Sequence, residues 1–340
     1  MAAELRKGGS AVYFKHPGIG DLIWHLPFLK AVAAAHPGEP VTVMCRPSTA
    51  AREVLATEPQ LQPWYLERTK SNLKELTGCL AAFRAIRPHT VWVLDASSRP
   101  VMAAKLAGVK HINAFGFGRK SQERWMPPDG ARLPGSMREL HPMELYWELA
   151  KTAGLPMSDI EPRLTADPGL VEAMRKRFSD QPRPWVFFGI GATNNLRRWP
   201  ADHFGELAKL LGPQIGTLFW FGGPGDRDAA RQAAAHAARQ GPAVDITGQL
   251  SLPEAIALLS LADVYIGNCS GPLNMAAAQG VLSFGLFGGS AVLNHSPMIE
   301  PIIRDRFFPG MRGITPKAAA ARIKPALARL QREPTAGSRG

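Results

Sequence analysis

The chain has 340 residues, of which 45% are hydrophobic and 20% are charged, and its formal net charge at pH 7 is +12. This composition is typical of a globular protein, and no run of 18 apolar residues occurs in the sequence, which excludes a membrane span by the usual length criterion. The opening residues lack the apolar core of a signal peptide, and three widely spaced cysteines make neither a disulfide framework nor a zinc site, so we expect a cytoplasmic protein.

The first half of the chain alternates strand-like and helix-like segments. Four short apolar runs are expected to be buried strands: 11–15, 41–45, 90–95 and 111–116. Three segments with apolar residues at helical spacing are expected to be helices: 21–36, 71–86 and 141–154. Strand–helix alternation of this kind predicts a mostly parallel, doubly wound α/β sheet.

After a proline-containing segment at 155–169, which we expect to be a linker, the same pattern starts again. Five apolar runs are expected to be strands: 185–191, 217–223, 243–248, 264–268 and 282–289. The helical segments between them are 201–212, 226–241, 252–262 and 272–280, and a basic, alanine-rich helix interrupted by Pro325 is expected at 316–333. The predicted domains are therefore 1–165, which includes the linker, and 166–315, followed by a basic C-terminal helix and tail at 316–340.

Lysine and arginine concentrate in two segments. Residues 105–138 hold seven of them against Glu123 and Asp129, and residues 304–340 hold nine against Asp305 and Glu333. Such segments are either solvated faces or surfaces for an acidic partner, which could be a phosphorylated substrate, an anionic membrane surface or nucleic acid. Nucleic acid is the least favoured of these partners, because the sequence has no helix-turn-helix, zinc-finger or aromatic RNA-binding signature.

A glycine-rich turn, HPGIGDLIWHLP (16–27), follows the first expected strand. Gly18 and Gly20 fit the first two positions of a dinucleotide fingerprint, but Ile23 stands where the third glycine is required, so we reject a nicotinamide site. Asp21 either caps the following helix or serves as a base that faces acceptor hydroxyls. The turn alone leaves both roles open, and His25 is expected to be a packed or capping histidine.

Three polar turns follow strands of the second half. Their sequences are GIGATNNLRRWP (189–200), FGGPGDRDAA (221–230) and GNCSGPLNMAAAQG (267–280). In the third turn, Ser270, Gly271 and Pro272 open a helix whose free N–H groups suit a phosphate, whereas the alanines that follow have an ordinary packing explanation. Asp226 and Asp228 have the D-x-D form of some metal sites, but they begin a helix, and we expect no metal.

Taken together, G-D-x-x-x-x-x-P (20–27), R-x-W-P (197–200), F-G-G-P (221–224) and S-G-P-x-x-x-A-A-A-x-G (270–280) resemble glycosyltransferase family 9. The order and spacing of these motifs match over residues 11–300. The family comprises the lipopolysaccharide heptosyltransferases. The resemblance implies a GT-B fold, in which two doubly wound Rossmann-like domains, one for the acceptor and one for the nucleotide sugar, face each other across a cleft.

The resemblance also implies roles for single residues. Asp21 matches the general base that deprotonates the acceptor hydroxyl, and Arg197 matches a lysine that pairs with the donor phosphates. The implied donor-binding residues are Thr193, Arg197, Gly223, Asp226, Ser270, Gly271 and Asn274. The expected acceptor-binding residues are Gly18, Gly20, Lys120 and Arg124, since the basic 105–138 segment would face an acidic acceptor.

Two positions depart from the family's D-[TS]-G-x-x-H pattern at the third turn. Cys269 stands where the family has aspartate, and Asn274 stands where it has histidine. Asparagine can donate a hydrogen bond to phosphate but carries no charge, and cysteine cannot replace the hydrogen bonds of a carboxylate to a sugar. We interpret these departures as a changed donor sugar or as reduced activity.

The sequence and the resemblance thus predict an inverting, metal-independent glycosyltransferase without a cofactor. It would move a sugar, with heptose the first candidate, from an ADP-linked donor to an acidic lipopolysaccharide or related glycan. The alternatives are a GT-B relative that uses another nucleotide sugar and a catalytically weakened nucleotide-sugar-binding protein. The basic C-terminal helix is a candidate peripheral contact with the anionic inner membrane.

Overall fold

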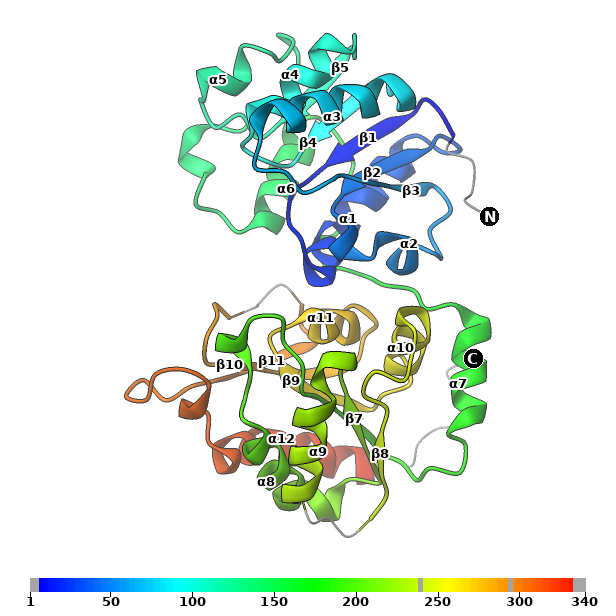
Figure 1. Cartoon of the computed structure of the whole chain (residues 1–340), viewed down its shortest axis with the longest axis vertical. Coiled ribbons are helices and arrows are strands. Elements are labelled where there is room, and N and C mark those ends of the chain that lie inside the picture. Colours follow the sequence, from blue (N-terminus) through cyan, green and yellow to red (C-terminus); the bar gives the residue numbers. More distant parts are fainter. Residues whose placement is uncertain (1–5, 238–240, 293–295, 333–340) are drawn as a thin grey trace. The chain divides into compact units, whose positions relative to one another are not determined.

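The computed structural model describes residues 6–237, 241–292 and 296–332. The chain divides into two compact units, Met1–Pro162 and Arg163–Gly340, and each unit has its own parallel β-sheet with helices on both faces (Figure 1). This confirms the predicted fold class of two doubly wound α/β units. Within the described residues, no helix is both long enough and apolar enough to cross a membrane.

The first unit has a five-stranded sheet with the order β3-β2-β1-β4-β5. Its strands are β1 (Ser10–Tyr13), β2 (Val41–Cys45), β3 (Leu61–Tyr65), β4 (Thr90–Val93) and β5 (His111–Ala114). Its helices are α1 (Ile19–Ala35), α2 (Ala51–Val54), α3 (Asn72–Ile86), α4 (Ser98–Leu106), α5 (Lys120–Glu123) and α6 (Pro142–Thr152). The neighbouring helices α3 and α4 cover one face of this sheet, where Tyr13 and Val93 lie side by side in the core.

The second unit has a six-stranded sheet with the order β11-β10-β9-β6-β7-β8. Its strands are β6 (Trp185–Gly189), β7 (Thr217–Phe221), β8 (Ala243–Asp245), β9 (Val264–Asn268), β10 (Leu282–Phe287) and β11 (Ile299–Ile303). Its helices are α7 (Pro168–Arg177), α8 (Ala201–Leu211), α9 (Arg227–Ala237), α10 (Leu252–Leu259), α11 (Gly271–Ala278) and α12 (Pro316–Arg332). Helices α8, α9 and α12 contribute to the core on one face, and β6 and β9 are adjacent in the middle of the sheet.

All nine expected strands are present. The elements that were not expected from the sequence are β3, β11, α2, α4, α5 and α7. Helix α7 begins at Pro168, inside the segment that we expected to be linker. Asp167 caps it by accepting a hydrogen bond from the backbone N–H of Leu170 at 2.9 Å. Asp-Pro is therefore a helix start here, with proline at the first helical position, where no N–H is needed.

The C-terminal helix corrects one further expectation. Helix α12 runs through Pro325 without the expected interruption, and it packs in the core of the second unit. Ala319, Ala320, Ile323 and Leu327 are buried on one side of it. Burying such a face contributes several kcal/mol at about 25 cal/mol per Å², which exceeds the cost of about 3 kcal/mol for an interior proline.

Candidate functional site

Asp21 lies in the first turn of α1, after the carboxyl end of β1. Its Oδ2 accepts a hydrogen bond from the backbone N–H of Gly18 at 2.8 Å, so the carboxylate caps its own helix. A Cβ atom on Gly18 would lie 2.9 Å from this oxygen, which explains why glycine precedes the helix. Within the described residues, Oδ1 of Asp21 accepts no hydrogen bond, so one oxygen of the half-buried carboxylate remains available.

His25 lies one turn further along α1 and is fully buried. Its ring stacks on Phe14 with 3.8 Å between the ring centres, and Nδ1 lies 2.6 Å from the carbonyl oxygen of Asp21. Burial lowers the pKa of His25 to about 3, so the ring is neutral and Nδ1–H donates to that carbonyl. The expectation of a packed histidine is confirmed, and its contact fixes the backbone that carries Asp21.

A charged network lies at the carboxyl edge of the first sheet. Glu75 of α3 accepts hydrogen bonds from Lys15 Nζ at 2.6 Å and Arg99 Nε at 2.6 Å. It also accepts one from the Tyr13 hydroxyl at 2.8 Å. Burial tends to raise the pKa of Glu75, but the hydrogen bonds from Lys15 and Arg99 outweigh it and lower that pKa. The network therefore holds two cations in place on an ionised carboxylate.

The two cations expected to bind an acceptor lie outside this network. Lys120 is the first residue of the short helix α5 and is exposed. Arg124 is also exposed, and its guanidinium lies over the ring of Trp125, 5.4 Å from the ring centre, in a cation–π contact. Their acceptor role stays a prediction, and Lys15 and Arg99 are the cations of this edge that sequence reasoning missed.

In the second unit, Asp226 joins two of the three polar turns. Its Oδ2 accepts a hydrogen bond from the backbone N–H of Gly223 at 2.9 Å, and its Oδ1 pairs with Arg198 Nη1 at 2.8 Å. A Cβ atom on Gly191 would lie 2.2 Å from Oδ2, so the glycine makes room for this buried carboxylate. Asp226 therefore positions the turns, and its predicted contact with a ribose remains untested.

The loop after β6 carries Thr193 and Arg197, which the resemblance assigned to the donor. Thr193 and Arg197 are both exposed, and no ion pair of Arg197 occurs within the described part of the chain. The next residue but one, Trp199, anchors the loop instead. Its ring Nε1–H donates to the carbonyl oxygen of Ile314 at 2.9 Å, and its backbone N–H donates to Asn268 Oδ1 at 2.9 Å.

The third turn begins at Asn268, the last residue of β9, which also donates from Nδ2 to the carbonyl oxygen of Ile190 at 2.7 Å. Ser270 precedes α11 without capping it, because its hydroxyl donates to the carbonyl oxygen of Asn268 at 3.2 Å. The first N–H groups of α11, including that of Gly271, therefore have no side-chain cap.

The two departures from the family pattern are both buried in this turn. Asn274 donates from Nδ2 to the carbonyl oxygen of Ser270 at 3.1 Å, so its amide already serves its own helix. Cys269 is 6% exposed. The predicted contact of Asn274 with the donor is not tested by this arrangement, and the nearby thiol is inaccessible to a large reagent.

Tyr265 is a residue of this edge that sequence reasoning missed. It is fully buried, and its hydroxyl has no hydrogen-bond partner of acceptable geometry among the described residues. A Cβ atom on Gly189 would lie 1.7 Å from that hydroxyl oxygen, and one on Gly267 would lie 2.6 Å from it. The paired glycines of β6 and β9 thus form the trough in which the phenol lies.

The surroundings of Tyr265 show that the three turns meet. Burial raises its pKa most, Ser270 lowers it through its side chain, and Asp226 and Cys269 raise it further. These groups come from the second and third turns, and Asp226 is joined to the first turn through Arg198. The phenol therefore stays protonated and lies at the edge that all three turns share. From the sequence alone, only Gly189 and Gly267 could have suggested where Tyr265 lies.

The D-x-D sequence does not form a pair of neighbouring carboxylates. Asp226 is buried, whereas Asp228 is exposed on α9 and forms an ion pair with Arg231. Over residues 6–237, 241–292 and 296–332, no group of three or more histidine, cysteine, aspartate or glutamate side chains is arranged to hold a metal ion.

Comparisons with known proteins agree with this geometry. A family model described as glycosyltransferase family 9 (heptosyltransferase) matches residues 93–302. Lipopolysaccharide heptosyltransferase 2 of Salmonella typhimurium is 25% identical over 291 residues, which cover 80% of this chain and 81% of that protein. Its namesake in Escherichia coli is 25% identical over 293 residues and covers the same shares.

Two solved structures have the same fold. The glycosyl transferase family 9 protein from Veillonella parvula has a TM-score of 0.74 and 18% identity, and covers 96% of this chain and 99% of that one. The ADP-heptose lipopolysaccharide heptosyltransferase II of Escherichia coli has a TM-score of 0.71 and 20% identity, and covers 95% of this chain and 99% of that one.

Proposed function

The chain belongs to glycosyltransferase family 9, and from this premise we propose that it transfers a heptose from a nucleoside diphosphate donor to an acidic lipopolysaccharide acceptor. The relatives that cover four fifths of the chain are named lipopolysaccharide heptosyltransferase 2, which supports this sugar and this acceptor. An Escherichia coli heptosyltransferase of the same fold was solved with ADP, which supports an ADP-linked donor.

The observation that carries the proposal is the meeting of the three polar turns at one edge of the second sheet. Arg197 is an exposed guanidinium on the first turn, and the uncapped start of α11 at Gly271 offers backbone N–H groups. These are groups that bind a diphosphate. We assign the donor to this edge, and its proposed ligands are Thr193, Arg197, Gly223, Ser270 and Gly271.

Two residues of the predicted donor set are proposed to position other groups rather than to contact the donor. Asp226 holds Arg198 and the turn at Gly223 in place, and Asn274 holds the start of α11 through Ser270. The hydrogen bonds that they already make support a positioning role for both. Their direct contact with the ribose or the diphosphate remains part of the hypothesis.

The proposed reaction is a single displacement. The acceptor hydroxyl attacks the anomeric carbon and gives its proton to Oδ1 of Asp21, while the bond from that carbon to the diphosphate oxygen breaks. Because the attack is in line with the leaving group, the configuration at the anomeric carbon inverts. Arg197 and the N–H of Gly271 stabilise the charge that grows on the diphosphate, and the proposal assigns no step to a metal.

The proposed location is the cytoplasm, with a peripheral contact at the inner membrane through α12. The apolar face of α12 is buried in the second unit, so its exposed basic residues are what a membrane would meet. Those residues are Lys317, Arg322, Lys324, Arg329 and Arg332. Each would contribute on the order of 1 kcal/mol near an anionic surface.

Two observations favour a second candidate function, the transfer of a different sugar. Cys269 and Asn274 replace an acidic and a basic side chain of the family pattern, and Tyr265 brings a neutral hydroxyl to the same edge. Uncharged side chains at the third turn suit a different sugar on the same diphosphate. Loss of turnover with retained donor binding is the remaining alternative.

The test is transfer in vitro. The purified protein is incubated with ADP-heptose, GDP-sugars or UDP-sugars and with lipopolysaccharide inner core from a heptose-deficient strain, and the acceptor mass and the anomeric proton signal are measured. A gain of one heptose with inverted configuration supports the proposal. Transfer from another nucleotide sugar supports the second candidate, and donor binding without turnover supports a weakened enzyme.

A further inference from the structure

Two adjacent phenylalanines, Phe307 and Phe308, are exposed on residues 303–312, which we call the aromatic segment. They are 73% and 65% exposed, and Ile303, at the end of β11, is 62% exposed. The other thirteen phenylalanines of the chain are all buried. The segment is orange in Figure 1 and projects from the second unit. Single exposed apolar side chains are normal on a protein surface, whereas a group of them indicates an interaction surface.

The turn that carries the two rings is fixed by its own contacts. Asp305 accepts a hydrogen bond at Oδ1 from the backbone N–H of Phe307 at 2.8 Å, and its own N–H donates to the carbonyl oxygen of Gly313 at 3.0 Å. Arg304 Nη1 donates to the carbonyl oxygen of Phe308 at 3.3 Å. A Cβ atom on Gly313 would lie 2.2 Å from that same oxygen. The rings are therefore exposed by a turn whose backbone is well defined.

The aromatic segment is also basic. Arg304, Arg306 and Arg312 are all exposed, and Asp305 is the one acidic residue in positions 303–312. The Arg306 guanidinium lies 4.6 Å from the centre of the Phe307 ring, in a cation–π contact. Arginine can keep its charge in water while its stem lies along apolar surface. The segment therefore presents apolar side chains and cations together.

This combination favours one kind of partner. A second copy of this chain would bring like charges together, because the chain has a formal net charge of +12. A phosphorylated small molecule or a nucleic acid would meet the arginines but would leave the aliphatic side chain of Ile303 in water. An anionic bilayer accepts both, because aromatic and aliphatic side chains enter the boundary below the headgroups while arginines stay at the lipid phosphates.

The aromatic segment lies at the donor edge of the second unit. It begins at the carboxyl end of β11, and two glycines that follow β10 link it to the first polar turn. A Cβ atom on Gly288 would lie 2.7 Å from the carbonyl oxygen of Gly310, and one on Gly289 would lie 2.0 Å from that of Leu196. Leu196 is itself 74% exposed. A bilayer at the segment would therefore meet the edge of the second unit to which the donor is assigned.

Helix α12 offers charge alone. Ile323 and Leu327 are buried, and among the described residues of α12 no large apolar side chain is exposed. Cations of this kind attract a protein to an anionic surface without inserting anything into it. Insertion requires apolar side chains that are free to leave water, and the aromatic segment has them.

We propose that the aromatic segment inserts into the interface of an anionic phospholipid bilayer, with its apolar side chains below the headgroups and its arginines at the lipid phosphates. The proposal names the inserting element and the lipid class for the peripheral location proposed above. It does not rest on the proposed reaction.

The first test detects insertion with the full chain and vesicles of phosphatidylethanolamine and phosphatidylglycerol whose acyl chains carry bromine. Bromine quenches the fluorescence of a tryptophan that reaches the acyl chains. Phe307→Trp should therefore be quenched more than wild type, which has the same eight native tryptophans. Leu73→Trp is the matched control, because Leu73 is 69% exposed on α3 of the first unit. Equal quenching of the two variants would overturn the insertion.

The second test measures binding to the same vesicles by flotation. Joint replacement Phe307→Ser and Phe308→Ser should weaken binding by about tenfold or more, because it removes the apolar area that enters the interface. Leu73→Ser should leave binding unchanged. Because both phenylalanines are exposed, the double variant should fold, and urea denaturation checks this. Vesicle binding as strong as that of wild type in the double variant would overturn the proposal.

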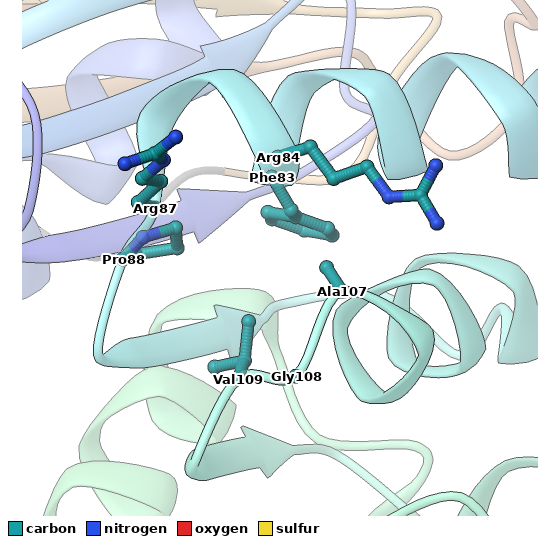
Figure 2. A pocket seen from close by; sticks show the side chains of 7 residues that line it. All are labelled: Phe83, Arg84, Arg87, Pro88, Ala107, Gly108 and Val109. Carbon is teal, nitrogen blue, oxygen red and sulfur yellow. The ribbon is translucent and has the colours of Figure 1, made fainter.

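The third test concerns charge. Arg306→Gln and Arg312→Gln should each weaken vesicle binding by about fivefold, and wild type should bind vesicles of phosphatidylcholine alone more weakly. The control is Arg84→Gln, which removes an exposed arginine of α3 that lines a pocket of about 520 Å³ in the first unit (Figure 2). An equal loss in Arg84→Gln would show a general effect of net charge and would overturn the role of the segment.

Other results identify other partners. If the double serine variant dissociates an oligomer in sedimentation velocity but binds vesicles normally, the segment is a contact between copies of the chain. If Lys324→Gln and Arg329→Gln abolish vesicle binding while the double variant retains it, α12 alone makes the contact. Either result would overturn the proposal. Absence of vesicle binding overturns this proposal alone, whereas absence of transfer with intact vesicle binding overturns the proposed function alone.

Discussion

Oδ1 of Asp226 lies 2.8 Å from Nη1 of Arg198, so the loop after β6 and the turn after β7 are joined by an ion pair. The side chain of Asp226 is 12% exposed and that of Arg198 is 34% exposed. Arg197 is adjacent in sequence but exposed, and it has no such partner within the described residues. Arg197 and Arg198 are therefore expected to have different roles, although they are adjacent in one motif.

The first prediction separates these two arginines. Arg198→Ala should lower the free energy of unfolding by about 1–3 kcal/mol, because it leaves the buried carboxylate of Asp226 without its charged partner. Arg197→Ala should change that free energy by less than about 0.5 kcal/mol but weaken ADP binding. Urea denaturation and calorimetry measure the two quantities, and the reverse pattern would show that the assignment is exchanged.

The second prediction concerns Asp21. Asp21→Asn should lower turnover by about 10²–10⁴, because the amide cannot take the acceptor proton. Stability should be nearly unchanged, since the amide oxygen can still accept from the N–H of Gly18. Turnover and urea denaturation test this together. Retained activity in a folded variant would remove Asp21 from the role of base.

The third prediction concerns Tyr265. Tyr265→Phe should raise the free energy of unfolding by up to about 1–3 kcal/mol, because it removes a buried hydroxyl that has no partner in the described residues. Affinity for the nucleotide sugar should change little, because the fully buried hydroxyl does not reach the surface. Thermal denaturation with and without ADP-heptose measures both quantities. A loss of stability would show that the hydroxyl has a hydrogen-bond partner in the folded protein.

The fourth prediction is a pH dependence of stability from His25. Burial lowers the pKa of the folded state to about 3, below the unfolded value of about 6.5, so the unfolded state binds a proton first as the pH falls. Stability from this group is present above about pH 6.5 and is lost progressively toward pH 3. Between pH 7 and pH 5 the loss should be about 2 kcal/mol.

His25→Gln is the variant for that measurement. Glutamine retains an N–H donor but does not titrate, so the difference in unfolding free energy between wild type and variant should shrink by about 2 kcal/mol from pH 7 to pH 5. A pH-independent difference would mean that His25 is solvated in the folded state.

The strands with the clearest sequence pattern are those buried on both faces, although the outer strands β5 and β8, which have exposed residues, were predicted as well. Strands β2, β6, β7 and β9 are continuous apolar runs, and every residue in them is buried. By contrast, β3 and β11 are outermost in their sheets, contain Pro63 and Pro301, and have mixed burial. An edge strand needs neither a continuous apolar run nor every N–H, so its pattern is weak.

The candidate site, too, could be predicted from the sequence only in part. The turns that follow β1, β6, β7 and β9 could be found because glycine and capping residues mark the ends of strands. The partners of each side chain could be predicted only in part, because the ion pair of Asp226 with Arg198 joins residues that are distant in the sequence and that the fold brings near. Arg99 and Tyr265 were missed because their partners, Glu75 and Gly189, are distant in the sequence.

The prolines of the two outer strands have a consequence for the behaviour of the protein at high concentration. β3 and β11 each end a sheet on one side, and each has a residue without an amide hydrogen in its middle, at Pro63 and Pro301. A strand from another molecule cannot form a continuous hydrogen-bond ladder with such an edge. On these two sides, the sheets are protected against edge-to-edge aggregation.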